Sequence, residues 1–442
     1  MKLNKIINEF KNKYRKSYNA YFYKFIIFKS YLKNLNFFSY FLKIKLLRLV
    51  QCNQFINNKK IKKDIILIVH SLSRGGAEKQ VVKLANLLIK KKFKVKIIIL
   101  DFNFKHNFKN SYIDDLNKKI SIEFIEKSKN FNKTDITSYT NYKNLDFLTY
   151  GDLYMVKSLT KLFERNKYSI IHSFLDDTNI IVGLAAMLVG KSSVILSLRS
   201  AAPWRFTFYK SYWKECYRIF AKQKNIKLVC NSKLNAIDYE NWLKIKKNSI
   251  KVTYNIFDFK YHKHNKRKND KNKIVFGAAC RLAPEKNLFF LLKIFKLIAK
   301  KNFYLEIQGK GYLKNRLINY SKKIDNIRFL GETNKINNFF NKIDVFILTS
   351  HIEGTPNVIL EAQNQGLPIL TTNVGGISEC VIKDYTCFFI DKKDPKKAAK
   401  EIIEHIKKKS FFEKKDIYLI KKKLIKFSSE EIYKKLIKIY GV

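Results

Sequence analysis

The chain has 442 residues, of which 46% are hydrophobic, more than one ordinary core holds and enough for two domains of typical size. Its 89 Lys and Arg against 36 Asp and Glu give a formal charge of +53, and this positive excess is spread along the chain. The sequence has no arginine-rich run, zinc-ligand pattern or RNA-binding aromatic signature, so we expect no nucleic-acid partner. The six cysteines form no Cys-x-x-Cys pair, and no apolar run reaches the roughly 20 residues that span a bilayer, so we expect a protein of the reducing cytoplasm that is not integral to a membrane.

Residues 1–62 differ from the rest of the chain. Glu9 is the only acidic residue among them, and aromatic residues alternate with lysines between positions 21 and 41. One interpretation is an arm that lies on an anionic membrane surface, where each basic residue contributes about 1 kcal/mol. The other is a helical extension that packs on the next domain. The first residues have no uninterrupted apolar core, so no secretory signal is expected.

From residue 63 the pattern becomes that of an α/β domain. A continuous apolar run at 65–69 predicts a buried strand, and apolar residues at helical spacing predict a helix over 77–90, after a glycine-containing loop. A strand at 95–100 completes a βαβ unit with parallel strands. We assign residues 63–258 to this first domain. Further strand candidates in it are 170–171, 194–198 and 227–230.

A second series of alternating elements follows a polar, aperiodic segment. Residues 259–273 have this linker composition, and we assign residues 274–425 to a second domain and 426–442 to a terminal helical segment, with its helix at 430–440. The whole pattern predicts two doubly wound α/β domains that face each other. In the second domain the predicted strands are 274–279, 304–307, 345–348 and 368–371, and the predicted helix is 288–299.

The loop after the strand at 345–348 is the strongest candidate for a site. It ends in Glu353-Gly-Thr-Pro-Asn-Val-Ile-Leu-Glu361, in which Thr355 is expected to be the N-cap and Pro356 the first residue of a helix that stops before Gly366. Ligands of open α/β sheets bind at the carboxyl ends of strands, and a helix N-terminus there suits a phosphate. Glu353 and Glu361 then need hydroxyl groups as partners, which a sugar supplies; the alternative is two solvated acids.

These motifs resemble those of the retaining glycosyltransferases of family 4, group 1 enzymes of surface polysaccharide and lipopolysaccharide assembly. The resemblance covers roughly residues 64–440 and rests on five motifs in the expected order. It implies the GT-B fold: two Rossmann-like doubly wound domains facing across a cleft, here with a basic N-terminal extension. The motifs are Ser73-Arg-Gly-Gly-Ala-Glu78, Arg281-Leu-Ala-Pro-Glu-Lys-Asn287, Gly309-Lys-Gly311 with Phe329-Leu-Gly331, Glu353 to Glu361 spaced as E-x7-E, and Gly375-Gly-Ile-Ser-Glu379.

The resemblance also implies roles for particular residues. Arg281 and Lys286 pair with the donor diphosphate, Glu361 accepts the ribose hydroxyls, and Glu353 contacts the transferred sugar near the reacting carbon. The expected phosphate cradle consists of the main-chain N–H groups of Thr355, Asn357 and Val358, with Gly75 and Gly76 approaching from the first domain. No metal or other cofactor is expected, because the chain has no Asp-x-Asp and cations with a helix end stabilise a leaving diphosphate.

The first domain departs from the family pattern. Many members have a histidine two or five residues after the position of His172, where this chain has Phe174 and Asp177, so Asp177 is the candidate to orient the sugar or acceptor in its place. His172 itself is as well explained by packing as by ligand binding. Arg199 and Arg205 lie in the acceptor half and are candidates to meet a lipid phosphate. Asn255 and Asp258 are expected to be structural.

The function expected from the sequence is sugar transfer with retention of configuration from a nucleotide diphosphate sugar to a lipid-linked saccharide or lipopolysaccharide, with UDP as the expected nucleotide. The enzyme would then be peripheral on the inner face of the cell membrane. Two alternatives stay open: a nucleotide-sugar epimerase of the same fold, and a catalytically inactive scaffold of glycan assembly. The sequence does not specify the sugar, linkage or acceptor.

Overall fold

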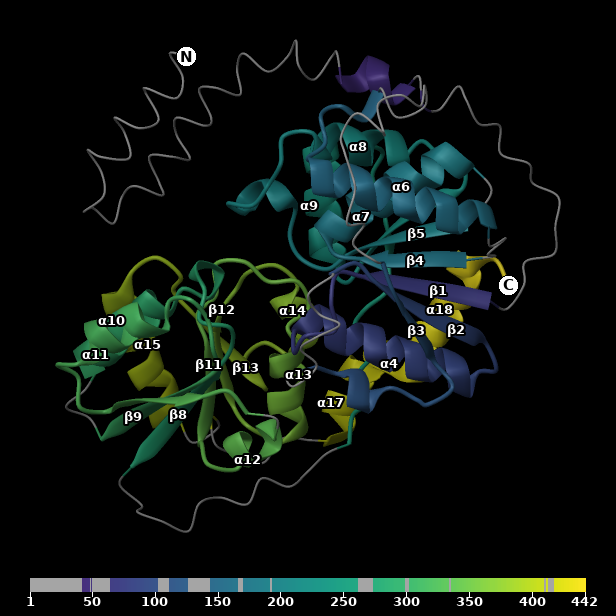
Figure 1. Cartoon of the computed structure of the whole chain (residues 1–442). Helices are drawn as coiled ribbons and strands as arrows, with labels where there is room; N and C mark the ends of the chain where they lie inside the picture. The colour runs from purple at the N-terminus through teal and green to yellow at the C-terminus, as the bar shows by residue number, and fades with distance from the viewer. Residues whose placement is uncertain are drawn as a thin grey trace, which may run out of the picture.

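The computed structural model consists of two α/β lobes that pack against each other (Figure 1). The structure describes part of the chain, and this part leaves out almost all of the predicted linker (259–273) and most of the basic extension (1–62). The described residues are 42–47, 49, 64–101, 111–125, 144–165, 170–190, 193–260, 273–298, 302–333, 335–408, 411 and 417–442.

The first lobe is built on a seven-stranded sheet in the order β3-β2-β1-β4-β5-β6-β7, and all its pairings are parallel. The reversal of order beside β1 makes it doubly wound, as predicted. The strands are β1 (Asp64–Val69), β2 (Lys94–Ile99), β3 (Ser121–Phe124), β4 (Ile170–Phe174), β5 (Ser193–Leu198), β6 (Ile226–Cys230) and β7 (Lys251–Val252).

The second lobe has a six-stranded parallel sheet in the order β10-β9-β8-β11-β12-β13. Every strand predicted for the second domain is present within two residues of its expected bounds. The strands are β8 (Ile274–Ala279), β9 (Phe303–Gln308), β10 (Ile327–Gly331), β11 (Val345–Leu348), β12 (Ile369–Thr372) and β13 (Cys387–Ile390).

Helices cover both faces of each sheet, because strands buried on two sides expose apolar side chains on both. In the first lobe α6 (Tyr150–Arg165), α7 (Asp176–Val189), α8 (Trp213–Phe220) and α9 (Lys233–Leu243) lie on one face, and α4 (Gly76–Lys90) on the other. In the second lobe α10 (Leu288–Ile298) and α15 (Pro395–Lys407) cover one face, and α13 (Asn357–Asn364) and α17 (Ile417–Leu424) the other. The remaining helices are α11 (Lys314–Ser321), α12 (Ile336–Phe340) and α14 (Ile377–Cys380), with short 3-10 turns.

The end of the chain returns to the first lobe. Helix α18 (Ser429–Tyr440), predicted from the sequence, buries Ile432, Leu436 and Tyr440 beside α4, against the sheet that the chain built first. Asp258 accepts hydrogen bonds from the main-chain N–H and the hydroxyl of Ser429, which confirms the structural role expected for this residue. The last helix therefore ties the two lobes together.

The described part of the N-terminal extension packs on the first lobe. Leu42, Leu46 and Leu49 are almost fully buried in the core that α6 and α7 share. Lys45 forms an ion pair with Asp146 at 2.5 Å. For these residues the packing interpretation holds. Residues 1–41, to which the membrane interpretation mainly referred, are outside the described part. Within the described residues no helix is both long and apolar enough to cross a bilayer.

Candidate active site

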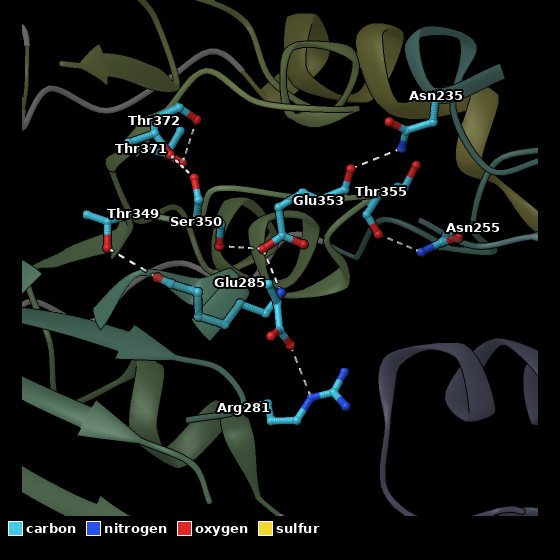
Figure 2. Close-up of polar contacts among 11 residues, drawn as sticks. Asn235, Asn255, Arg281, Glu285, Thr349, Ser350, Glu353, Thr355, Thr371 and Thr372 are labelled. Atoms are coloured by element: carbon cyan, nitrogen blue, oxygen red, sulfur yellow. Dashed lines mark hydrogen bonds and ion pairs between the residues drawn. The ribbon is translucent and has the colours of Figure 1, made fainter. Parts of the chain in front are cut away.

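The loop after β11 places Glu353 in the contact between the lobes. Its side chain is only 7% exposed, and its Oε1 accepts hydrogen bonds from Ser350 Oγ at 2.6 Å and from Lys286 Nζ at 2.7 Å (Figure 2). Its main-chain oxygen accepts a hydrogen bond from Asn235 Nδ2 of α9 at 3.0 Å. One carboxylate oxygen and the backbone of Glu353 are thus fixed from both lobes, which preorganises the side chain.

Lys286 reaches Glu353 from the loop after β8. The 3-10 turn η6 (Pro284–Lys286) ends at Asn287, whose φ of 51° lies in the left-handed region that Asn tolerates better than most residues. Asn287 therefore closes this turn without a glycine. Burial disfavours the charged form of Lys286, but the adjacent Glu353 carboxylate outweighs it and raises the pKa of Lys286 above its usual value. Lys286 is a fixed cation at neutral pH.

Helix α13 begins one residue later than predicted. Pro356 occupies the N-cap position, and the hydroxyl of Thr355 donates to the main-chain oxygen of Asn231 in the first lobe. The prediction that Thr355 caps the helix is wrong, because its hydroxyl joins the two lobes instead. The predicted stop is confirmed, since Gly366 follows the helix with a φ of 70°.

Two glycines allow the backbone of this loop to pass close to its neighbours. A Cβ added at Gly375 would lie 2.0 Å from the main-chain oxygen of Glu353, and φ there is 51°. A Cβ added at Gly354 would lie 2.4 Å from the main-chain oxygen of Arg199, in the other lobe. Both contacts are with backbone atoms, which cannot move aside as a side-chain end can. Glycine at 354 therefore lets the two lobes approach, and glycine at 375 lets two loops of the second lobe pack together.

Helix α4 of the first lobe forms the opposite wall, as Figure 1 shows for α4 and α13. Asn357 Nδ2 donates to the main-chain oxygen of Gly76 at 3.0 Å, and Gln80 Nε2 donates to Asn357 Oδ1 at 3.0 Å. Lys79 Nζ lies 2.6 Å from Glu361 Oε1. The glycine loop that the sequence placed across from the donor motifs therefore does lie beside them.

Gly75 and Gly76 are glycine for different reasons. A Cβ at Gly76 would lie 3.5 Å from Asn357 Nδ2, which is an ordinary contact with the other lobe. A Cβ at Gly75 would lie 2.1 Å from Glu78 Oε2, on its own helix. Gly75 thus leaves room for the Glu78 carboxylate, whereas Gly76 is the one that faces α13.

Arg281 lies at the open edge of the contact. Its side chain is 73% exposed, and its Nε is 3.6 Å from Glu285 Oε1. In Figure 2 this side chain points from the second lobe toward the ribbon of the first. Burial raises the pKa of Glu78 on α4, and the positive charge of Arg281 acts in the opposite direction, so Arg281 lies within electrostatic range of this helix. Glu361 contacts α4 directly through Lys79, whereas the contact of Lys286 is Glu353.

The residues predicted in the first lobe are dispersed. Arg199 lies partly buried at the lobe contact, where it donates to Asn255 Oδ1 and burial lowers its pKa to about 10. Arg205 is 40% exposed on the outer surface and pairs with Asp238 at 2.6 Å. Asp177 is exposed on the first turn of α7, within electrostatic range of His70 and Lys210. Arg199 is therefore at the lobe contact and Arg205 on an exposed loop, and their binding of an acceptor stays a prediction.

His172 is a packing residue. Its Nδ1 lies 2.8 Å from the Tyr440 hydroxyl, its Nε2 lies 2.7 Å from Ser197 Oγ, and its ring stacks on Phe174. Burial lowers the pKa of His172 to about 3, so the imidazole is neutral. Of the two interpretations left open by the sequence, packing is the one that the structure supports.

Sequence reasoning missed several residues that join the lobes. Glu379 of α14 accepts hydrogen bonds from the main-chain N–H groups of Lys233 and Leu234, both at 2.9 Å, and from the Tyr254 hydroxyl at 2.8 Å. Glu379 belongs to a motif that the sequence singled out, but its partners lie more than a hundred residues away in the chain, and no local pattern indicates that contact. Lys79 follows the glycine motif directly and was missed because Glu361 is distant in the chain. Asn255 is structural as expected, since its Nδ2 donates to the main-chain oxygen of Thr355 at 2.8 Å.

Comparison with known proteins agrees with this geometry. Residues 259–423 match the family model described as glycosyl transferases group 1. The chain is 31% identical over 269 residues to the UDP-Gal:alpha-D-GlcNAc-diphosphoundecaprenol alpha-1,3-galactosyltransferase of Escherichia coli, covering 55% of this chain and 67% of the relative. It is 26% identical over 323 residues to the capsular polysaccharide biosynthesis glycosyltransferase CapM of Staphylococcus aureus, covering 67% of this chain and 82% of the relative.

The fold is also that of solved glycosyltransferase structures. Anabaena HepE, solved in complex with UDP, superposes with a TM-score of 0.63 at 17% identity, over 86% of this chain and 99% of that one. At this identity the likeness shows the fold alone. It confirms the predicted architecture of two Rossmann-like domains.

Proposed function

The chain belongs to the group 1 glycosyl transferases of the GT-B fold, which act in polysaccharide biosynthesis, and from this we propose a specific reaction. The enzyme transfers a sugar from a nucleotide diphosphate sugar to a lipid-linked saccharide or lipopolysaccharide, and it keeps the anomeric configuration. It acts from the cytoplasm, peripheral on the inner face of the cell membrane. The name of the Escherichia coli relative supports a UDP-sugar donor and a diphosphate-linked lipid acceptor.

The observation that carries this proposal is the Lys286–Glu353 pair. A cation and an acid lie 2.7 Å apart in loops at the carboxyl ends of β8 and β11, beside the N-terminus of α13 and opposite that of α4. This is where open α/β sheets bind ligands. A nucleotide diphosphate sugar combines an anion for the lysine with hydroxyl groups for the carboxylate.

Each residue then has a defined task. Lys286 and Arg281 neutralise the diphosphate as negative charge grows on the leaving oxygen. The rest of the phosphate cradle consists of the main-chain N–H groups of Thr355, Asn357 and Val358 and of the glycine loop at Gly75 and Gly76. Glu353 holds a hydroxyl of the transferred sugar. Glu361 accepts the ribose hydroxyls. In a retaining transfer the departing phosphate oxygen takes the proton of the acceptor hydroxyl, so no imidazole is required.

The acceptor side is assigned to the first lobe. Asp177 orients the sugar or acceptor, and Arg199, which faces the lobe contact, meets an acceptor phosphate. Arg205, on an exposed loop of the same lobe, is the second candidate to meet that phosphate. No metal is part of this scheme. Among the described residues no cluster of His, Cys, Asp and Glu is arranged to hold one.

A screen of nucleotide sugars by thermal shift tests the donor, because a ligand that binds only the folded protein raises the melting temperature. Transfer to a lipid-linked acceptor is then measured with and without EDTA. We expect Glu353→Gln to lower kcat about a hundredfold while UDP still binds. Product formation without acceptor would favour an epimerase, and equal inactivity of the parent and the variant would favour a scaffold. Stabilisation by no nucleotide sugar contradicts the proposal.

A further inference from the structure

Helix α9 carries apolar side chains on its solvent side as well as on its core side. Ala236, Tyr239 and Leu243 are buried, as expected for a helix that covers a sheet. Leu234 and Ile237, on the opposite side, are 45% and 39% exposed. A helix on a soluble surface normally presents polar residues there. These two outward apolar side chains leave α9 without a uniformly polar solvent face.

The loop around the 3-10 turn η5 (Pro203–Arg205) presents a second apolar group. Phe208 is 54% exposed, more than most other large apolar residues of the described chain, and its ring stacks on Phe206 at 5.0 Å between centroids. Arg205 lies over the Trp204 ring at 4.5 Å. Aromatic rings with an adjacent cation are typical of side chains at a membrane interface.

These two features form one surface. Arg205 Nη2 donates to Asp238 Oδ1 of α9 at 2.6 Å, and the Ala202 N–H donates to Asp238 Oδ2 at 2.9 Å. Asp238 follows Ile237 directly and lies one turn after Leu234. The loop is therefore held against the outward stripe of α9. We call Trp204, Arg205, Phe206, Phe208, Leu234 and Ile237 the α9–η5 surface.

The surroundings of this surface are positively charged. The acids nearby are neutralised: Asp238 pairs with Arg205, Asp152 with Lys210 at 2.8 Å, and Glu215 with Arg218 at 2.6 Å. Exposed lysines in and after α9 add charge without matching acids; they are Lys233, Lys244, Lys246 and Lys247. The surface thus joins apolar insertion with attraction to anions, the combination that binds interfacial segments to anionic lipid.

The α9–η5 surface also adjoins the active site. The first N–H groups of α9 are bound by Glu379 of the second lobe, and Asn235 on the same turn holds the main-chain oxygen of Glu353. Figure 1 places α9 above the second lobe at this side of the contact. A partner on the outer side of α9 therefore lies next to the loop that carries Glu353.

We propose that the α9–η5 surface docks the enzyme on an anionic lipid bilayer and so presents the edge of the active site to the membrane. The proposal rests on the proposed function only in that a lipid-linked acceptor makes this placement useful. A bilayer suits the surface better than a folded protein does, because its apolar groups project singly from a loop and a helix among lysines. Docking by this surface needs no contribution from residues 1–41.

Vesicle flotation with the full chain tests the proposal. The probe is phosphatidylcholine vesicles with 30% phosphatidylglycerol, on the order of what anionic leaflets contain. We expect Phe208→Ser with Leu234→Gln and Ile237→Gln to weaken partitioning at least about tenfold. The matched control changes Tyr418→Gln, Leu419→Gln and Ile425→Ser, which are 69%, 45% and 61% exposed in and after lysine-rich α17. It should bind like the parent.

Tryptophan fluorescence gives a second measurement that does not depend on a stability change. All three tryptophans of the chain, Trp204, Trp213 and Trp242, lie in or under this surface, and Trp213 is buried. Anionic vesicles with brominated acyl chains should quench the parent, and Trp204→Phe should remove most of that quenching. Pure phosphatidylcholine vesicles should quench neither.

Two results would overturn the proposal. One is equal vesicle binding by the parent and the α9–η5 triple variant; the other is an equal loss in the α17 control. UDP binding is measured on every variant, since it depends on the second lobe. If the chain binds vesicles as described but binds no nucleotide, the proposed function is refuted and the docking surface is supported. If it binds nucleotide but the vesicle results fail, the docking surface is refuted and the proposed function is not.

Discussion

The loops around Lys286 and Glu353 in the second lobe and the loop around Arg205 in the first use charge in opposite ways. In the second lobe the ion pair is 18% and 7% exposed and is supported by Ser350 and by the first lobe. In the first lobe the Arg205–Asp238 pair is 40% and 21% exposed. A buried pair needs its exact partners, whereas an exposed one tolerates rearrangement.

This difference matches the two substrates that we propose. A nucleotide diphosphate has a fixed arrangement of charge, so a rigid, partly desolvated pair is suited to it. A lipid-linked glycan at a bilayer surface is variable and mobile, and an exposed aromatic and basic surface accommodates it. Preorganisation is therefore concentrated on the donor side, and the acceptor side relies on weaker contacts distributed over a larger area.

The largest test of this comparison is Lys286→Met against Arg205→Met. Removing Lys286 leaves the Glu353 carboxylate buried without its cation, so we expect a loss of about 4 kcal/mol of unfolding free energy. Removing Arg205 should cost less than about 1 kcal/mol, because water replaces it at Asp238. Urea denaturation followed by circular dichroism measures both.

A double variant shows whether the pair or the packing is responsible. Lys286→Met with Glu353→Gln removes the unpaired charge, so it should be more stable than Lys286→Met alone by about 1–3 kcal/mol. If the two single variants and the double variant are simply additive, the pair is not the source of the difference between the lobes.

The second test concerns the pH dependence of a buried acid in the first lobe. Asp176, at the start of α7, is fully enclosed and accepts hydrogen bonds from the Tyr217 and Tyr239 hydroxyls. Burial raises its pKa to about 6, against the lowering effect of those hydroxyls. Between about pH 4 and 6 the folded state therefore binds more protons than the unfolded state, and this group makes stability fall as pH rises.

Asp176→Asn cannot ionise, so its stability relative to the parent should increase from pH 4 to pH 7 by up to about 3 kcal/mol. The amide oxygen can still accept from both tyrosines. Burial also raises the pKa of the neighbouring Asp177, so Asp177→Asn should change in the same direction, and we expect a smaller change because Asp177 is exposed whereas Asp176 is fully enclosed. Parallel curves for both variants would show that Asp176 titrates normally.

Much of the fold followed from the sequence because its signals are local. Apolar runs such as 65–69 and 345–348 have strand length, and the spacing over 77–90 is helical, so these elements and the two doubly wound domains were predictable. The terminal helix was found at 430–440 in the same way, but its packing on the first lobe depends on contacts between distant segments. The pattern alone gives no such information.

The candidate site shows the same difference between local signals and contacts of distant segments. Glu353, Lys286 and the glycine loop lie in short contiguous motifs, so the sequence located them. The error at Thr355 arose because a capping hydroxyl and one that bridges two lobes look alike in sequence. Lys79, Glu379 and Asn235 gave no signal, since each acts on a partner more than a hundred residues away. Asp177 as a replacement for the family histidine stays a prediction.

The smallest effect that we predict concerns the proposed nucleotide-binding site, where the two lobes meet. Lys79 pairs with Glu361 across the contact, while Lys83, one turn later on α4, donates to the main-chain oxygen of Ile256 at 2.9 Å. The Lys79 pair holds the first lobe over Glu361, so Lys79→Met should lower the population of the closed arrangement and raise the Kd for UDP about threefold. Lys83→Met has the same change of charge on the same helix and should leave the Kd within error of the parent. Isothermal titration calorimetry measures the Kd of both variants. Tighter UDP binding by Lys79→Met would contradict the prediction and would mean that Lys79 competes with the ribose for Glu361.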